Sequence, residues 1–324
     1  MKTPKEYIIE QLESLRAIKI PDANTATPEA LIELIKKAVL SKKFRKYGVQ
    51  PEYLQHINSA IALNIKSNKP IHFDFPFGAN KLWRLEESPE PDWAELFSLV
   101  YFLKWLKPIA ENYKPGFCFE FCSDDVVIEM LNNVPKTDTE SYIAGFLELM
   151  EFMKKILPEN MQLVFSRVGD RYTGTGFVDE INEKIEKINK ENGGALPQLT
   201  EQQKGSIELN VKLKSGQDND PFWREKNQLL HNAYLSLSQK RPYYQKPGRI
   251  TVFTNPINKV IAVGSTKTSV AKFWAGIGAL KKRDDSFIET VLSPTQAEAA
   301  RVSWEPINIP GLEGKNFQKI RIVD

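Results

Sequence analysis

The sequence predicts an α/β protein with a mostly parallel sheet covered by helices on both faces, an N-terminal helical extension and an α+β C-terminal part. Short runs in which apolar and polar residues alternate are typical of strands, and longer runs with helical spacing separate them. A strand followed by a helix and another strand favours parallel pairing. The predicted strands are 70–75, 117–122 and 162–166, and the predicted helices are 93–113, a short one through 126–131, 139–156 and 178–192.

Residues 1–68 are predicted to form the helical extension. Apolar residues recur at helical spacing through 7–15 and 31–39, and Thr27 followed by Pro28 is a typical helix start. A third helix is expected at 51–65. We expect this extension to pack on an α/β core formed by 69–192, with residues 200–324 forming an α+β part on the same core.

The segment 93–113 is apolar on nearly every side, so this helix should lie inside the protein. Asp92 and, three residues later, Glu95 are placed to cap its start. In the strand 117–122, a side-chain period of two places three phenylalanines on one face and Cys118, Glu120 and Cys122 on the other. Two cysteines on one strand face lack bridging geometry, so both are predicted to be reduced thiols.

The C-terminal part carries a weaker pattern. Residues 193–199 have no periodicity and form the best candidate linker. The expected helices lie near 200–214, 221–240 and 268–280, and the expected strands lie near 249–254, 259–263, 302–304 and 320–323.

Composition and missing motifs exclude several classes of protein. The chain has 324 residues, and 44 Lys+Arg against 41 Asp+Glu leave a net charge of +3, which argues against a nucleic-acid platform. The N-terminus lacks the layout of a signal peptide, and the apolar stretch 96–106 is too short to span a bilayer, so we predict a cytoplasmic protein without membrane contact. With no phosphate-binding or dinucleotide-binding loop and three scattered histidines, we predict no cofactor and no metal.

Ser123, Asp124 and Asp125 form the most informative turn in the sequence. They follow the strand 117–122 and begin a helix, and ligands of open α/β sheets bind at the carboxyl ends of the strands. The alternative is that such residues simply cap the helix. Glu120 favours a functional interpretation, because a carboxylate in a buried sheet is unfavourable unless it is paired.

Arg167, Arg171 and Tyr172 follow the next strand and should gather at the same edge. Two arginines can hold a phosphate or carboxylate through paired hydrogen bonds, whereas the alternative is a solvated loop with surface ion pairs. Lys81 follows the first strand and can approach this edge, although a lone lysine is more often solvated. We therefore predict a small anionic substrate at this edge of the sheet.

Three further residues are predicted to bind substrate in the C-terminal part. Lys267 lies in a run of small and hydroxylated residues, 264–269, that can cradle an anion or form a simple turn. His231 and Arg241 belong to a basic and aromatic cluster that continues through 240–244. That segment also carries the alternative function, in which the chain is an RNA- or protein-binding protein that uses stacking and charge. A simpler explanation of the segment is an ordinary helix end, where Lys and Arg are common.

The order of short motifs between residues 75 and 131 resembles that of the isocyanide (isonitrile) synthases. The similarity covers about residues 70–150, a quarter of the chain, and its specificity lies in the order of the motifs. The matching residues are Phe75-Pro76-Phe77 with Lys81 nearby, Pro91-Asp92-x-Ala94-Glu95, a long helix, Tyr113-x-Pro115-Gly116, and Ser123-Asp124 closing a strand.

This resemblance implies a Rossmann-like fold and an enzyme of small-molecule biosynthesis that converts the amine of an amino acid to an isonitrile. The added carbon would come from a phosphorylated ketose such as ribulose 5-phosphate. Such chemistry needs groups that bind a carboxylate and a phosphate, together with acid/base groups. Arg167 or Arg171, Lys81 and Asp124 suit these roles. The predicted catalytic residues are Lys81, Glu120 and Asp124. The family usually has Ser-Asp-Gly at the turn where this chain has Asp125, which adds a charge at the expected pocket.

Overall fold

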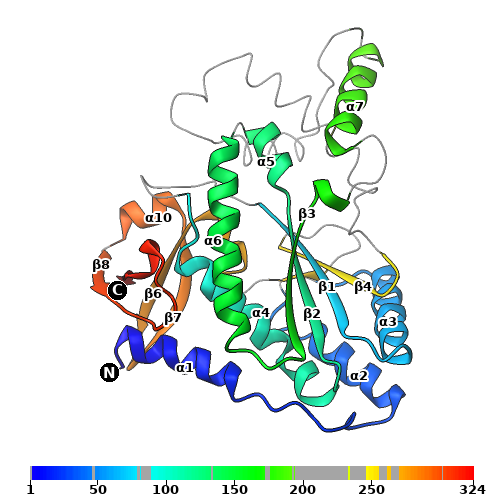
Figure 1. The fold of residues 1–324 in the computed structure, drawn as a ribbon, viewed down its shortest axis with the longest axis horizontal. Helices are drawn as coiled ribbons and strands as arrows, with labels where there is room; N and C mark the ends of the chain where they lie inside the picture. The colour runs from blue at the N-terminus through cyan, green and yellow to red at the C-terminus, as the bar shows by residue number, and fades with distance from the viewer. Residues whose placement is uncertain are drawn as a thin grey trace.

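A five-stranded parallel sheet forms the centre of the molecule, as predicted. The computed structural model describes residues 2–45, 48–78, 81, 89–132, 134–171, 176–191, 193, 233, 246–254, 261–263, 270–300 and 302–324. Every strand pair in this sheet is parallel, and the strand order is β3-β2-β1-β4-β5 (Figure 1). The strands are β1 (Ile71–Phe77), β2 (Phe117–Ser123), β3 (Met161–Arg167), β4 (Arg249–Phe253) and β5 (Ile261–Ala262).

Helix α4 (Trp93–Asn112) lies between this sheet and a second, C-terminal sheet, and it is buried on nearly all sides, as its composition predicts (Figure 1). Asp92 and Glu95 form the expected capping box at its start. On the sheet, the phenylalanines of β1 and β2 face α4: the rings of Phe102 and Phe119 stack with centroids 4.9 Å apart. The other helices along this part of the chain are α5 (Asp125–Asn132), α6 (Lys136–Lys154), the short η1 (Gly169–Arg171) and α7 (Phe177–Glu191).

The three helices predicted for the N-terminal region are present as α1 (Pro4–Arg16), α2 (Pro28–Val39) and α3 (Pro51–Lys66). Thr3 caps α1 through a capping box, and the Thr27 side chain accepts a hydrogen bond from the Ala30 backbone N–H at the start of α2. Their buried apolar residues belong to the same hydrophobic cluster as those of β1 and α4. The helices therefore share one core with the parallel sheet.

The C-terminal sheet has the strand order β7-β6-β9-β8 and mixes parallel with antiparallel pairs. The prediction of a helix near 268–280 is wrong. This segment contains a short 3-10 helix, η3 (Val270–Ala275), which is followed by a strand. The helices expected near 200–214 and 221–240 lie outside the described residues. The remaining elements are β6 (Ile277–Arg283), β7 (Ser286–Leu292), α10 (Pro294–Ala299), β8 (Val302–Pro306), η4 (Lys315–Phe317) and β9 (Lys319–Val323).

Gly276, just before β6, and Gly278, within it, allow close backbone contacts with neighbouring elements. A Cβ at Gly276 would lie 2.1 Å from the Leu292 carbonyl oxygen, and one at Gly278 would lie 2.2 Å from the Ala94 nitrogen. This approach lets the Gly278 N–H donate to Asp92 Oδ1, at 3.2 Å, beside the start of α4. The two glycines are therefore packing positions between β6, β7 and α4.

Replacing Gly278 with alanine should lower the free energy of unfolding by about 1–3 kcal/mol, because the methyl group overlaps backbone atoms that cannot move freely. Urea denaturation measures this loss. Gly48→Ala is the matched control, since no atom lies within 4 Å of a Cβ at that position. Equal stability of the two variants would contradict the close-packing explanation.

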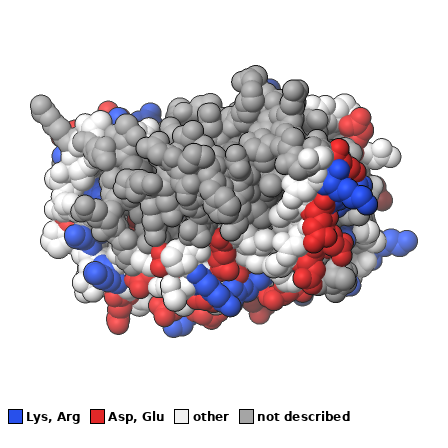
Figure 2. Space-filling model, turned by 90° about the horizontal axis from the view of Figure 1, so that it is seen from above, with Lys and Arg blue, Asp and Glu red and all other residues white. Residues whose placement is uncertain are grey.

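Basic and acidic residues are nearly equal in number, and side chains of both signs lie on the surface (Figure 2). Figure 2 shows one face of the molecule, on which Lys and Arg side chains are interspersed with Asp and Glu side chains among the described residues. Within the described ranges, none of the helices combines the length and apolarity that crossing a bilayer requires. Cys118 and Cys122 are both buried, and they are not joined by a disulfide bond.

Candidate active site

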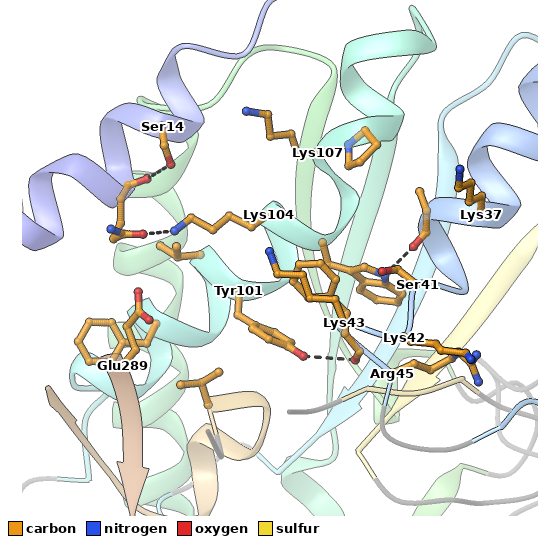
Figure 3. Close-up of a pocket in the computed structure, with 18 of the residues that line it drawn as sticks. Ser14, Lys37, Ser41, Lys42, Lys43, Arg45, Tyr101, Lys104, Lys107 and Glu289 are labelled. Atoms are coloured by element: carbon orange, nitrogen blue, oxygen red, sulfur yellow. Dashed lines mark hydrogen bonds between the residues drawn. The ribbon is translucent and has the colours of Figure 1, made fainter. Parts of the chain in front are cut away.

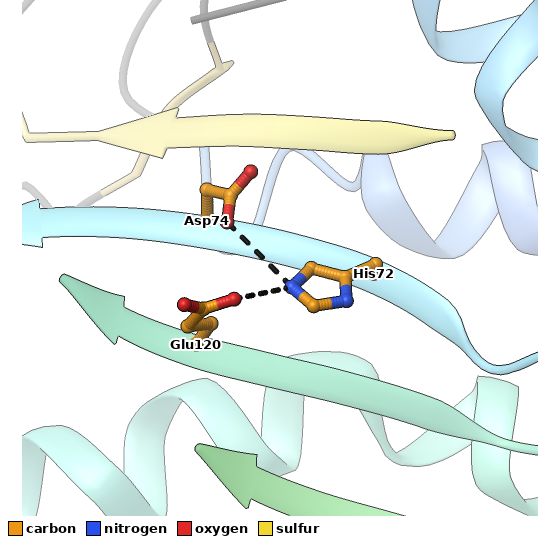
Figure 4. Close-up of side chains that lie close together, drawn as sticks. All are labelled: His72, Asp74 and Glu120. Atoms are coloured by element: carbon orange, nitrogen blue, oxygen red, sulfur yellow. Dashed lines mark hydrogen bonds and ion pairs between the residues drawn. The ribbon is translucent and has the colours of Figure 1, made fainter. Parts of the chain in front are cut away.

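The sheet face opposite the phenylalanines carries a cluster of four charged side chains in the middle of the sheet, and Figure 4 shows three of them, His72, Asp74 and Glu120. His72 and Asp74 come from β1, Glu120 comes from β2 and Arg249 begins β4; we refer to these four residues as the charged cluster. Alternation along β1 places His72 and Asp74 on the same side, and parallel pairing aligns Asp74 with Glu120 and His72 with Arg249. Parallel strands are usually apolar on both faces, so this cluster is exceptional.

Positive and negative groups alternate within the charged cluster. His72 Nε2 donates to Glu120 Oε2 at 2.8 Å and lies 3.6 Å from Asp74 Oδ1. Arg249 Nη1 donates to both carboxylates, at 2.7 Å to Asp74 Oδ1 and 2.9 Å to Glu120 Oε2. Buried charges are tolerated only when they are paired and hydrogen-bonded, and this arrangement meets that requirement.

The two carboxylates hold His72 in its protonated form. Burial alone would lower the pKa of His72, but hydrogen bonds to Asp74, Cys118 and Glu120 outweigh it and raise the pKa to about 11. His72 is therefore an imidazolium at neutral pH. With Arg249, it neutralises the two carboxylates.

A cavity of about 390 Å³ opens onto the cationic side of the charged cluster. Its wall includes His72 and Arg249 together with Cys118, Gln162 and Lys69, whereas Asp74 and Glu120 lie beneath. The side chains of His72 and Arg249 are 21% and 32% exposed, against 0% and 6% for Asp74 and Glu120. The cavity therefore presents positive groups to a ligand, which suits a carboxylate or a phosphate.

His72, Asp74 and Glu120 together offer the donor atoms of a metal site. Potential ligand atoms of the three residues lie within 4.8 Å of one another. However, Arg249 Nη1 already bonds the two carboxylate oxygens that face His72. A guanidinium in this position supplies the positive charge that a metal ion would bring, so the residues present fit an ionic cluster better than a metal centre.

The protonation of His72 predicts how stability depends on pH. A pKa raised in the folded state contributes stability that is fully present below the unfolded pKa of about 6.5 and is lost as the pH rises through the folded pKa. Between these limits, unfolding releases a proton, so the free energy of unfolding should fall as the pH rises. Urea denaturation between about pH 7 and about pH 9 should show a steeper fall for the wild type than for His72→Gln. Parallel slopes would show that His72 titrates normally.

At the carboxyl edge of the sheet, the structure brings together Asp125 and Arg167, as the sequence predicts. Arg167 Nε donates to Asp125 Oδ2 at 2.7 Å, and its Nη2 donates to Glu140 Oε1 at 2.7 Å. Ser123 Oγ accepts from the Asp125 backbone N–H at 3.2 Å. Hydrogen bonds to Glu140, followed by those to Asp125, raise the pKa of Arg167, although burial opposes this shift. Arg167 would therefore have to exchange a carboxylate partner in order to hold a substrate anion.

The backbone of the Ser123–Asp125 turn is tied to the neighbouring strands. The Asp124 N–H donates to the Phe77 carbonyl oxygen at 2.8 Å, and the Val168 N–H donates to the Ser123 carbonyl oxygen at 2.9 Å. The side chains of Ser123, Asp124 and Asp125 are all buried. These three residues thus form a fixed turn at the edge of the sheet, apart from the cavity beside His72.

Lys81 lies away from the charged cluster, in a second buried ionic group. Its Nζ is 2.7 Å from Glu95 Oε2 and 3.1 Å from Asp92 Oδ1, at the start of α4. It also donates to the carbonyl oxygens of Phe273 and Gly276, at 3.3 and 3.0 Å. Its catalytic role stays a prediction, because these contacts describe a lysine that compensates two buried carboxylates.

Several predicted binding residues lie beyond what the structure describes. Tyr172, His231, Arg241 and Lys267 fall outside the described residues, as does the segment 240–244 that carries the alternative function. Arg171 ends η1, and only its backbone is described. The roles predicted for these residues stay predictions.

Sequence reasoning missed His72, Asp74 and Arg249. A signal for two of them was available: in β1, His72 and Asp74 occupy the positions that alternate with phenylalanines, as Glu120 does in β2. Two strands with acidic residues on the same face indicate a buried polar cluster once they are paired. Arg249 carried no such signal, because its pairing with β1 depends on a connection of more than a hundred residues.

Comparisons with known proteins agree with the predicted fold. No family model and no curated protein sequence matches this chain. The crystal structure of the PvcA protein from Pseudomonas aeruginosa matches with a TM-score of 0.60 and 14% sequence identity, and the match covers 92% of this chain and 99% of that one. This likeness shows the fold, and it confirms the α/β fold with a parallel sheet that the sequence predicts.

Proposed function

We propose that this protein is an isonitrile synthase-like biosynthetic enzyme that acts on an amino acid or similar amine, with a phosphorylated sugar as co-substrate. The fold shared with PvcA and the order of motifs from Phe75 to Leu131 support this class of enzyme. The observation that carries the proposal is the charged cluster, in which buried carboxylates lie under a cation-lined cavity. Buried charged groups with shifted pKa values, such as His72, are common at reaction centres of enzymes.

The exposed cations of the charged cluster suit the anionic part of a substrate. An amino acid carries a carboxylate and a ketose phosphate carries a phosphate, and His72 and Arg249 can donate hydrogen bonds to either. Because the pKa of His72 is about 11, its imidazolium is a better anion holder than a proton donor near neutral pH.

Glu120 is the group best placed to move protons in this proposal. Attack of an amine on a carbonyl carbon requires the loss of protons from the ammonium nitrogen, and a carboxylate is a suitable acceptor. Glu120 Oε2 lies within hydrogen-bond distance of both His72 and Arg249, which lie at the cavity wall. A substrate anion that takes over these two cations would free the carboxylate to accept a proton.

The carboxyl edge of the sheet is the alternative place for the reaction, as the sequence predicts. Both substrates would then bind there, because the amine must reach the carbonyl carbon and this edge lies apart from the cavity beside His72. Ser123, Asp124 and Asp125 would orient the polar groups of a substrate, and Arg167 would hold a phosphate after exchanging Glu140, which is 43% exposed. Arg171, Tyr172, His231, Arg241 and Lys267 are proposed to add contacts to the same substrate.

A turnover assay tests the proposal. The purified protein is incubated with ribulose 5-phosphate and each of the common amino acids, and isonitrile products are sought by mass spectrometry, with an isonitrile synthase as the positive control. We expect an isonitrile from at least one amino acid. If the control enzyme forms product while the folded protein forms none with any amino acid, the proposed function is wrong.

A further inference from the structure

A cavity of about 1240 Å³ opens between the N-terminal helices and α4, apart from the cavity beside His72 (Figure 3). Its walls come from α1, α2, the chain through 41–45 that follows α2, and α4, with Glu289 of β7 at one end. We call it the helical groove. Nothing in the proposed chemistry uses it.

The floor of the helical groove is apolar and fixed. Phe97, Val100, Tyr101 and Trp105 present one side of α4 to it. Tyr101 Oη donates to the Phe44 carbonyl oxygen at 3.2 Å, and Trp105 Nε1 donates to the Ala38 carbonyl oxygen at 3.1 Å. These bonds satisfy the polar ends of both aromatic side chains, so their rings remain available as an apolar surface.

The rim of the helical groove is strongly basic. Six basic side chains line the groove against two acidic ones, Glu10 and Glu289. The basic residues come from different segments and surround the apolar floor, as Figure 3 shows for the residues it labels. A concave surface lined by one sign of charge concentrates ions of the opposite sign. The six residues are Lys37, Lys42, Lys43, Arg45, Lys104 and Lys107.

Lys104 extends from α4 across the groove toward α1, where its Nζ donates to Gln11 Oε1 (Figure 3). Burial lowers the pKa of Lys104. An anion beside Lys104 would favour its charged form and offset that burial. The groove thus combines a central ammonium group with an apolar floor.

We propose that the helical groove is a binding site for an anionic amphiphile, a small molecule with an apolar chain or ring system and a carboxylate, sulfonate or phosphate head. The apolar part would lie on Phe97, Val100 and Trp105, and the head would meet Lys104 and the basic rim. Ligand pockets for drug-sized molecules measure roughly 300–1,000 Å³, so this volume accommodates an extended chain. The proposal is independent of the proposed catalytic function.

Dodecanoate and anilinonaphthalene sulfonate, a dye that fluoresces in apolar sites, test this proposal on the full-length protein. We expect the dye to bind with a rise in fluorescence and dodecanoate to displace it. Dodecylamine, which has the same chain with a positive head, should displace it poorly, and ribulose 5-phosphate should not displace it. Failure of either the dye or dodecanoate to bind would overturn the proposal.

Two variants locate the site. Lys104→Met and Lys37→Gln should each weaken dodecanoate binding about three- to tenfold, because each removes a charge from the groove. Lys36→Gln is the control: Lys36 neighbours Lys37 on α2 but pairs with Glu33 and is not among the residues that line the groove. Circular dichroism checks that all three variants fold. Equal weakening in the control, or unchanged binding in both test variants, would contradict binding in the groove.

Discussion

Replacing Glu120 with glutamine should lower turnover by about 100-fold or more while the protein stays folded. Glutamine keeps the size of the side chain but removes the charge that His72 and Arg249 share, at 2.8 and 2.9 Å. The variant loses its proposed proton acceptor, and its excess positive charge holds substrate anions in a changed position. Steady-state kinetics on the amino acid identified by the turnover assay measures the loss.

The control for this variant is Glu151→Gln, on the exposed surface of α6, where Glu151 pairs only weakly with solvent-exposed Lys154. Its turnover should equal that of the wild type. Thermal unfolding of both variants separates lost catalysis from lost structure. A Glu120→Gln enzyme that folds and turns over at the wild-type rate would remove Glu120 from the reaction.

Replacing Lys81 with methionine should lower the free energy of unfolding by about 3–5 kcal/mol, because it leaves buried carboxylates without their cation. Lys81 is 5% exposed, and Glu95 is fully buried. Tyr142 Oη donates to Glu95 Oε1 at 2.9 Å, which satisfies only part of that carboxylate. Urea denaturation near neutral pH measures the loss.

The pH dependence of this loss distinguishes an uncompensated charge from lost packing. Burial raises the pKa of Glu95 to about 7 even with Lys81 beside it, and removal of the lysine raises it further. Because the pKa of Glu95 is higher in the folded protein than in the unfolded chain, burying the charged carboxylate destabilises the folded state. Protonation removes that charge, so the free energy of unfolding rises again as the pH falls. The loss in Lys81→Met should therefore shrink toward acidic pH.

Lys107→Met provides the matched control for Lys81→Met. Lys107 lies on α4 and pairs with Glu111 at 3.4 Å, but both side chains are 39% exposed. Removing an exposed ion pair costs about 1 kcal/mol or less. A Lys81 variant no less stable than this control would contradict the structural role of Lys81.

The order of strand, helix and strand was sufficient to predict a parallel sheet, because a helix between two strands favours their parallel pairing, as β1, β2 and β3 show. The same reasoning failed at 268–280, where the apolar composition fits either a helix or a strand. There the structure depends on tertiary contacts. Gly276 and Gly278 let the backbones of β7 and α4 approach closely, and no local pattern in the sequence reveals these contacts.

The candidate site was predictable in part. Glu120 was identified because a carboxylate in a buried strand needs partners, but those partners lie far away in the sequence. Arg249 is 129 positions from Glu120 and 175 from Asp74, so only the strand order brings them together. Lys81 was expected at the sheet edge, yet it joins Asp92 and Glu95, the two residues that were correctly predicted to cap α4.

Transfer of labelled carbon is the sharpest test of the proposed reaction. Wild-type protein and Glu120→Gln are incubated with an amino acid and ribulose 5-phosphate that is uniformly labelled with a heavy carbon isotope, and the isonitrile carbon is read by nuclear magnetic resonance. We expect a labelled isonitrile carbon from the wild type and a much smaller signal from the variant. Absence of labelled isonitrile from folded wild-type protein with every amino acid, while an isonitrile synthase assayed beside it produces the signal, would show that the protein does not catalyse this reaction.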